Sequence, residues 1–388
     1  MHSGLAVLLR DGDPLVTGRR IGLLTHPAAV DAGLRSAVDL LHGDPRWRLA
    51  ALFGPEHGIR GDAQAGAPVG SATDAQTGLP VHSLYGATKV PTPEMLGGID
   101  TIVVDLQDIG VRYFTYPATV LGVVEAAAAA GVAVVILDRP APLSGTQVEG
   151  GGLRPELRSL VGVHDVPIRH GLTLGELARL VASARGLPLP TVIGMEGWSR
   201  AGWFDATGLT WIPPSPNLPT LDALALYPGT CLLEGTSLSE GRGTTRPFEQ
   251  VGAPWFAGPA ARRFADAFNE RGLAGVRARP TTFVPTFSKH AGVACGGIQL
   301  HVSDRAALRP TEVGLQVIAI AHALAGSYLA WRDTAFDRLA GDPAVRQTLT
   351  SGGDLGALIA DWRAHAATFS RERTPWLLYP SADPATVS

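Results

Sequence analysis

Short apolar runs alternate with amphipathic segments through the first half of the chain. Near-continuous Val, Ile and Leu is typical of buried parallel strands, and it predicts strands at Ile21–Thr25, Leu49–Phe53, Thr101–Asp105 and Val132–Leu137. Helical spacing predicts helices at Ser36–Leu41, Pro93–Leu96, Ala118–Ala130 and Thr173–Ala184. Gly131 supplies a helix stop, and Thr173 with Glu176 forms a capping-box pattern. The alternation predicts an α/β fold with a Rossmann-like, doubly wound parallel sheet.

The pattern changes after Trp211–Leu221, a stretch rich in proline and turn residues that we interpret as the join between two domains. Beyond it, helices are predicted at Pro259–Arg271, Thr311–Ala325 and Leu355–Thr368, and strands at Val276–Val284 and Gly297–Val302. We therefore expect a Rossmann-like N-terminal catalytic domain over residues 1–222. A smaller α+β domain over residues 223–388 is expected to complete the cleft.

The composition of the chain argues against several classes of protein function. The 388 residues are 45% hydrophobic and 17% charged, with a net charge of −3 and no run of like charges. This balance gives no electrostatic reason to expect nucleic acid or a membrane surface as partner. No apolar run is long enough for a membrane span, and the two cysteines are too far apart in sequence for a zinc or disulfide framework. The N-terminus lacks the pattern of a signal peptide, so we expect a cytoplasmic protein, with an exported form left open.

Polar side chains follow all four predicted strands of the first domain. In open α/β sheets, ligands bind outside the carboxyl ends of the strands. Any one of these residues is as well explained by a helix cap or a loop ion pair, but their number favours a site. The residues are His26 after the first strand, Glu56, His57 and Arg60 after the second, Asp105, Asp108 and Arg112 at the third, and Asp138 and Arg139 after the fourth.

Several common motifs are missing. The turn after the first strand lacks G-x-G-x-x-G, and the chain has no P-loop, no G-x-S-x-G and no H-E-x-x-H. We therefore expect no nucleotide cofactor and no metal. Carboxylates, arginines and aromatic residues facing a cleft are the residue types that glycoside hydrolysis uses, since paired carboxylates do the acid and base work.

The second domain begins with a dense polar run, Leu233–Glu249, in which glycines and hydroxyl residues surround Glu234, Glu240, Arg242 and Arg246. Such a sequence makes a poor helix and a poor strand. It predicts an ordered loop that brings backbone N–H groups and arginines to an anionic ligand.

At these segments the chain resembles the exo-β-N-acetylmuramidase (NamZ-type) family. The matching stretches are GLLTHPAAVD (Gly22–Asp31), LFGPEHGIRGDAQAG (Leu52–Gly66), LPVHSLYG (Leu79–Gly86), DLQDIGVRYFTYPAT (Asp105–Thr119), LDRPAPLSG (Leu137–Gly145), the long run Pro213–Trp255 and FVPTFSKHAG (Phe283–Gly292). The resemblance implies a Rossmann-like domain joined to a smaller one, with the site between them. It also implies release of terminal β-linked N-acetylmuramic acid from peptidoglycan fragments without a nucleotide cofactor.

The roles of individual residues follow from their chemistry. Glu56 is the expected general acid, because partial burial after a strand favours its protonated form. The second carboxylate is Glu234, Glu240 or Asp108, or the substrate's own acetamido group acts as nucleophile. We expect Arg60, Arg242 or Arg246 to hold the lactyl carboxylate, with Arg112 and Arg139 as the next candidates. The other expected substrate contacts are His26, His57, Asn217 and an aromatic residue, Tyr113, Tyr116 or Trp211.

Two other hypotheses remain open from the sequence. A metal-dependent amidase or deacetylase acting on muropeptides would use His26, His57 and an aspartate as ligands. A non-enzymatic muropeptide-binding protein would use the same arginines and aromatic residues but would need no poised acid.

Overall fold

A seven-stranded sheet forms the centre of the N-terminal lobe in the computed structural model, which describes residues 1–60 and 72–381. Within these residues the strand order is β3-β4-β2-β1-β5-β6-β7, and all neighbours are parallel except β3 and β4. Numbered along the chain, the parallel strands have the order 3-2-1-4-5-6 of dinucleotide-binding sheets. The strands are β1 (Arg20–Thr25), β2 (Arg48–Gly54), β3 (Ala72–Thr73), β4 (Pro80–Ser83), β5 (Thr101–Asp105), β6 (Ala133–Leu137) and β7 (Thr191–Ile193).

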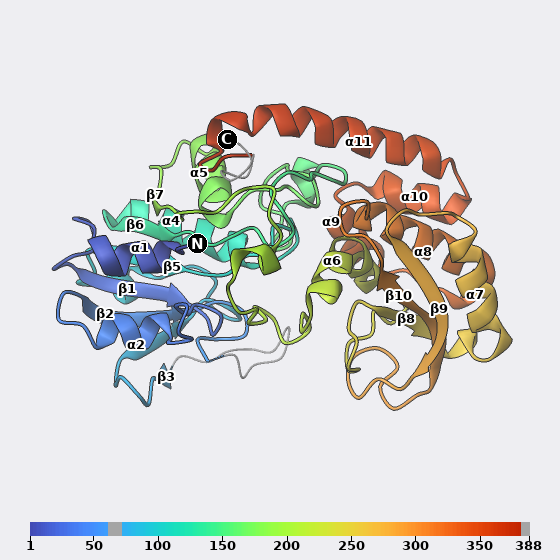
Figure 1. The fold of residues 1–388 in the computed structure, drawn as a ribbon, viewed down its shortest axis with the longest axis horizontal. Helices are drawn as coiled ribbons and strands as arrows, with labels where there is room; N and C mark the ends of the chain where they lie inside the picture. The colour runs from blue at the N-terminus through green and yellow to red at the C-terminus, as the bar shows by residue number, and fades with distance from the viewer. Residues whose placement is uncertain (61–71, 382–388) are drawn as a thin grey trace.

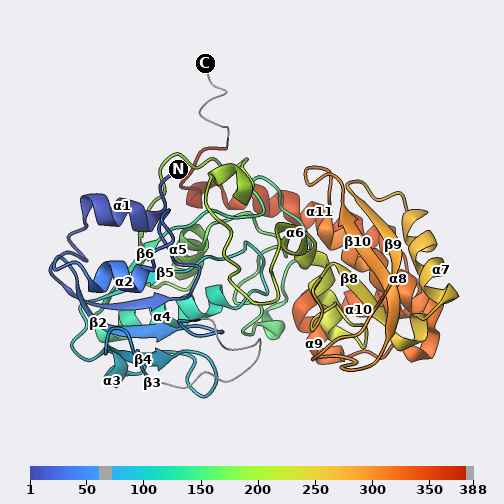
Figure 2. The same ribbon diagram turned by 60° about the horizontal axis from the view of Figure 1, so that its bottom comes forward.

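Helices cover both faces of this sheet (Figure 2). On one face, α1 (Gly4–Asp11) and α2 (Ala37–His42) pack against alternate side chains of β1, β2, β5 and β6. On the other, α3 (Pro93–Leu96), α4 (Tyr116–Ala130) and α5 (Leu174–Ala184) pack against the remaining ones. Because both faces are buried, the strands need apolar side chains at every position.

The C-terminal lobe contains a smaller antiparallel sheet of order β8-β10-β9, formed by β8 (Gln250–Ala253), β10 (Cys295–Val302) and β9 (Val276–Phe283). The helices around it are α6 (Leu221–Thr230), α7 (Pro259–Asn269), α8 (Pro310–Ala325), α9 (Asp333–Ala340), α10 (Pro343–Ser351) and α11 (Leu355–Glu372). Short 3-10 turns lie at Pro155–Leu157, Phe204–Thr207, Cys231–Gly235, Pro254–Phe256, Gly326–Tyr328 and Thr374–Trp376. No helix in the described part of the chain is long and apolar enough to cross a membrane.

The long helix α11 runs from the C-terminal lobe back to the N-terminal one (Figure 1). After it, Arg373 donates hydrogen bonds to the carbonyls of His170 and Gly171, at 2.8 and 2.6 Å. The Tyr379 hydroxyl donates to Asp138 Oδ2 at 2.6 Å. The residues after α11 therefore pack on the N-terminal lobe, although the sequence analysis groups them with the second domain.

The sequence predicts the fold class and the central strands correctly. The α/β architecture is confirmed, and β5 has the predicted bounds. The capping box of Thr173 and Glu176 is present, and Gly131 ends α4 in a left-handed conformation. The prediction missed α1, β3, β4, β7, β8, α6, α9 and α10. Pro80 begins β4 and Pro228 lies inside α6, and a proline in such a position obscures the local pattern.

Most of the polar residues at the strand ends hold loops together. Asp105 and Arg139 form a buried ion pair with a distance of 2.5 Å between Oδ1 and Nε. Asp138 accepts hydrogen bonds from the Thr173 hydroxyl at 2.6 Å and from Gly175 N at 3.0 Å. These contacts connect the ends of neighbouring strands, as the loop ion-pair interpretation expects.

His26 fills the switch point of the sheet, where the strand order reverses between β1 and β5. Its Nε2 accepts a hydrogen bond from Gln107 N at 2.8 Å, and its Nδ1 lies 3.2 Å from the Tyr116 hydroxyl. Burial holds the pKa of His26 well below its ordinary value. His26 is therefore buried, neutral and engaged within the protein, so its contacts give no support to the expected role in substrate binding.

Asp108 is also enclosed within the N-terminal lobe. Its Oδ2 accepts a hydrogen bond from Gly110 N at 2.8 Å, and its Oδ1 is buried without a partner among the described residues. Burial raises the pKa of Asp108 to about 7. A carboxyl group with a raised pKa binds its proton more tightly in the folded state, so its contribution to stability is lost as the pH rises from about 4 to about 7.

We expect Asp108→Asn to remove this pH dependence, because Asn keeps the acceptor for Gly110 N and carries no charge. The difference between about 7 and the ordinary 3.8 corresponds to at most about 4 kcal/mol. The variant should be more stable than the wild type at pH 8 and gain nothing at pH 4. Urea unfolding of both proteins at pH 4, 6 and 8 measures the difference. A difference that is the same at all three pH values would contradict the protonation of Asp108 in the folded protein.

Candidate active site

A cavity of about 810 Å³ lies between the two lobes and is lined by both. The N-terminal lobe contributes residues that follow β2, β4 and β5, together with a loop at Leu160 and Val161. The C-terminal lobe contributes the predicted polar loop, the segment Phe287–Lys289 and one side of α9. The charged residues of the lining are Glu56, Glu234, Glu240, Arg242, Lys289, Arg332 and Arg338.

Glu56 lies in a tight turn directly after β2. The turn is closed by a hydrogen bond of 3.0 Å from Gly58 N to the Pro55 carbonyl. His57, in the third position of this turn, has a φ of 74°, a conformation that a non-glycine residue adopts only at a cost of order 1–3 kcal/mol. His57 and Glu56 both line the cavity. The strained turn fixes the direction in which Glu56 leaves the strand.

Two hydroxyl groups adjoin the Glu56 carboxyl group. Thr115, the N-cap residue of α4, makes no capping bond and instead lies with its hydroxyl 2.8 Å from Glu56 Oε2. Tyr85 is hydrogen-bonded to Glu56 as well, and burial together with this carboxylate raises the pKa of Tyr85 to about 12. A hydroxyl can donate to a carboxylate or accept from a carboxylic acid. The same geometry therefore supports both protonation states of Glu56.

The C-terminal lobe presents two more carboxylates, held by two cations. Arg242 contacts Glu234 at 2.7 Å and Glu240 at 3.4 Å. Lys289 contacts the other oxygen of Glu240 at 2.8 Å. Burial alone lowers the pKa of Arg242, but the two carboxylates outweigh it and leave that pKa above its ordinary value. Glu240 is 1% exposed with both oxygens engaged, whereas the Glu234 side chain is one third exposed.

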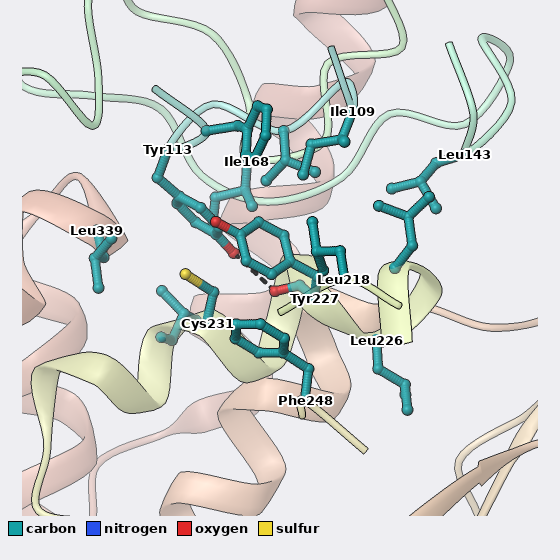
Figure 3. Close-up of a cluster of buried hydrophobic side chains, with 14 of the residues drawn as sticks. Ile109, Tyr113, Leu143, Ile168, Leu218, Leu226, Tyr227, Cys231, Phe248 and Leu339 are labelled. Carbon is teal, nitrogen blue, oxygen red and sulfur yellow. Dashed lines mark hydrogen bonds between the residues drawn. The ribbon is translucent and has the colours of Figure 1, made fainter. Parts of the chain in front are cut away.

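Apolar and aromatic side chains also line the cavity and form its floor. They are Tyr113, Leu218, Tyr227, Cys231, Phe248 and Leu339, which belong to the buried hydrophobic cluster drawn in Figure 3. The Tyr113 hydroxyl donates to the carbonyl of Pro228, and the guanidinium carbon of Arg242 lies 5.1 Å from the centre of the Phe248 ring. Burial holds the pKa of the Cys231 thiol well above its ordinary value, so this side chain stays an apolar part of the floor. A floor of this kind excludes water from one face of a ligand.

The structure brings six of the predicted site residues to this cavity: Glu56, His57, Tyr113, Glu234, Glu240 and Arg242. The predicted ordered loop is also present, since Gly241 and Gly243 adopt φ angles of 79° and Gly243 accepts a hydrogen bond from Thr286 N at 2.8 Å. Two glycines in this conformation let the chain turn sharply on each side of Arg242.

Six others are not among the lining residues: His26, Arg60, Asp108, Arg112, Asn217 and Arg246. Arg60 pairs with Asp74 at 2.9 Å, and Arg246 is half exposed and pairs with Glu249 at 3.2 Å. Arg112 is buried and donates to backbone carbonyls. Asn217 is buried, and its Nδ2 has no partner among the described residues. Arg60, Arg112 and Arg246 are thus engaged with other groups of the protein, and Arg242 is the one expected arginine that lines the cavity within the described residues.

The aromatic candidates also need correction. Tyr116 is fully buried and donates to the Pro214 carbonyl at 2.7 Å, and Trp211 packs edge-on against Phe204. Neither lines the cavity. Phe287, which the sequence analysis did not select, lines the cavity with 40% of its surface exposed.

The sequence analysis also missed Tyr85, Thr115, Lys289, Arg332 and Arg338. Lys289 had a usable signal, because it is one of only two lysines in the chain and lies in the matching stretch Phe283–Gly292. Arg332 and Arg338 had none, because their position depends on how α9 packs. The end of the matching stretch Leu52–Gly66, from residue 61 on, lies outside the described residues.

The arrangement gives no support to the metal-dependent hypothesis. Within residues 1–60 and 72–381, no three His, Cys, Asp or Glu side chains lie together as a metal-binding group. Both ring nitrogens of His26, one of the proposed ligands, are engaged within the protein.

Comparisons with known proteins agree with the two-lobed structure. Family models described as exo-beta-N-acetylmuramidase NamZ, N-terminal and C-terminal, match residues 21–222 and 225–379. The peptidoglycan beta-N-acetylmuramidase NamZ of Bacillus subtilis is 44% identical over 381 residues, which cover 98% of this chain and 91% of that protein.

Two solved structures, both titled DUF1343 family proteins from Bacteroides fragilis, share the fold. One has a TM-score of 0.90 and 36% identity over 97% of this chain and 98% of its own. The other has a TM-score of 0.78 and 29% identity over 98% of this chain and 99% of its own. With both halves matched by the family models, the chain belongs to the exo-β-N-acetylmuramidase NamZ family.

Proposed function

We propose that this protein is a glycoside hydrolase that releases terminal β-1,4-linked N-acetylmuramic acid from peptidoglycan fragments during cell-wall turnover. The observation that carries the proposal is the placement of Glu56 from one lobe and Glu234 and Glu240 from the other around one cavity. Membership of the NamZ family supports the choice of sugar. The cavity volume of about 810 Å³ lies within the roughly 300–1,000 Å³ of small-ligand sites.

Glu56 acts as the general acid. Its carboxyl group gives a proton to the leaving oxygen of the glycosidic bond as the bond from that oxygen to C1 breaks. A water molecule supplies the hydroxyl group that C1 gains, and its remaining proton replaces the one that Glu56 gave. The Thr115 hydroxyl at 2.8 Å keeps the carboxyl group in place before and after the transfer. Because the turn holds Glu56 at the end of β2, the proton donor approaches the substrate from the N-terminal lobe.

Glu234 acts as the second carboxylate. Its Oε1 is fixed by Arg242, while its Oε2 accepts no hydrogen bond from any residue that the structure describes. Because Glu234 lines the cavity, its negative charge is available to stabilise the positive charge that develops on the sugar ring during bond cleavage. Glu240, nearly buried between Lys289 and Arg242, instead holds the two cations and the loop in position.

We expect Glu56→Gln to lower kcat by about 10²- to 10⁴-fold, because Gln keeps the size of the side chain but has no proton to transfer. The measurement is release of N-acetylmuramic acid from its chromogenic β-glycoside. The dissociation constant of free N-acetylmuramic acid and the melting temperature should change little.

A variant that keeps more than about a tenth of the wild-type kcat would show that Glu56 is not the acid. A wild-type protein that binds the sugar without releasing it from the glycoside would favour a binding protein over an enzyme.

Glu234→Gln and Glu240→Gln form a matched pair that separates the two carboxylates of the C-terminal lobe. Glu234→Gln should lower kcat by at least about 10²-fold with little change in melting temperature, because it removes a charge that acts on the substrate. Glu240→Gln should destabilise the protein by about 1–3 kcal/mol, because it leaves the buried Lys289 without its carboxylate. Full activity of Glu234→Gln in a stable protein would contradict this assignment.

A further inference from the structure

The cations of the cavity fall into two groups. Arg242 and Lys289 are neutralised by Glu234 and Glu240, at distances of 2.7 to 3.4 Å. Arg332 and Arg338 line the same cavity, and neither forms an ion pair with any carboxylate in the described part of the chain. The positive charge available to a ligand therefore comes from Arg332 and Arg338.

The position of these two arginines follows from α9. Arg332 is its N-cap residue, and Arg338 lies in its last turn. Ala335, three residues from each, lines the cavity between them, so the three side chains form one ridge along the helix. The small Ala335 leaves room for a ligand group between two guanidinium groups.

The two acidic residues of α9 form ion pairs with an arginine of the next helix, α10. Arg346 of α10 binds Asp333 at 3.0 Å and Asp337 at 2.8 Å. These are the carboxylates on the same helix that lie nearest in sequence to Arg332 and Arg338. Because Arg346 engages both, the helix separates its charges into a neutralised acidic side and an uncompensated basic side that faces the cavity.

Ordinary helix electrostatics explain only half of this arrangement. A cation in the last turn, such as Arg338, is stabilised by the helix dipole. A cation at the N-terminal end, such as Arg332, is disfavoured by the same dipole. Arg332 also has a fixed backbone, since its N–H donates to the Gly235 carbonyl at 2.8 Å. The helix itself therefore gives no electrostatic reason for Arg332 to lie at the cavity.

We propose that Arg332 and Arg338 bind a carboxylate of the substrate and thereby select muramic acid over glucosamine, an inference that rests on the proposed function. N-acetylmuramic acid differs from N-acetylglucosamine by a lactyl ether that carries one carboxylate. When a stem peptide is attached, the lactyl carboxyl becomes an amide, and the peptide supplies carboxylates instead. The guanidinium fork matches the planar geometry of either carboxylate.

The test uses Arg332→Gln, Arg338→Gln and the double variant, with Arg262→Gln as control. Arg262 is an exposed arginine of α7 that does not line the cavity, so its loss removes the same charge from another surface. The substrates are the chromogenic β-glycoside of N-acetylmuramic acid, the same glycoside with its lactyl carboxyl group as a methyl amide, and a glycoside that bears a stem peptide.

Arg332→Gln and Arg338→Gln should each lower kcat/KM by about tenfold on the substrate whose carboxylate the two arginines bind. This is the loss expected of one charge-assisted hydrogen bond. If the lactyl carboxylate is the ligand, the loss appears on the free-acid glycoside and not on the methyl amide. If the stem peptide is the ligand, the loss appears only on the peptide-bearing glycoside. The Arg262→Gln control should match the wild type on all three substrates.

Calorimetric binding of free N-acetylmuramic acid, of N-acetylglucosamine and of a muramyl peptide decides the proposal independently of turnover. Wild-type protein that releases no sugar would contradict the proposed function, while the binding comparison would still decide the role of the arginines. If the double variant loses less than about threefold in kcat/KM and in affinity for both carboxylate ligands, Arg332 and Arg338 do not select the substrate.

Discussion

The arrangement of the two lobes depends on one buried guanidinium group, that of Arg112. It donates hydrogen bonds to the carbonyls of Gly151, Gly152 and Val166 in the N-terminal lobe and of Leu339 in the C-terminal lobe, at 2.7 to 2.9 Å. Burial lowers the pKa of Arg112 to about 10, which still leaves it charged at neutral pH. Close packing reinforces the contact, since a Cβ added at Gly341 would lie 2.1 Å from the Gly152 carbonyl oxygen. Removing the charge would leave several buried carbonyls without a donor.

This contact determines which groups can meet in the cavity. Leu339 belongs to α9, so Arg112 fixes the helix that carries Arg332 and Arg338 against the lobe that carries Glu56. The tail after α11 adds a second attachment through Tyr379 and Asp138. A site built across two lobes needs such restraints, because small displacements of either wall would separate Glu56 from the carboxylates of the C-terminal lobe.

The sequence predicts the central sheet and its polar edge, but it does not predict which side chains face the cavity. Continuous apolar runs predict the central strands, and polar residues at their ends predict the side of the sheet that bears the site. Glu56 and His57 were found in this way because they immediately follow β2 and no other element intervenes. The same rule also selected His26 and Arg112, whose side chains are buried and do not line the cavity, since strand-end position does not reveal whether a side chain faces the cavity or the interior. Arg332 and Arg338 depend on tertiary packing of a helix that local periodicity did not predict.

The charged residues that do not line the cavity show how the N-terminal lobe stabilises so many charges near one edge of its sheet. A buried charge is costly unless it is paired or hydrogen-bonded. Asp105 and Arg139 pair with each other, and the two terminal nitrogens of Arg112 donate to carbonyl groups. On the cavity wall the balance is different: Arg242 and Lys289 are matched by carboxylates, and Arg332 and Arg338 remain exposed to solvent without a carboxylate in the described residues. Charges that stabilise the fold are therefore paired inside it, and charges left in contact with solvent at the cavity are the ones that a ligand can use.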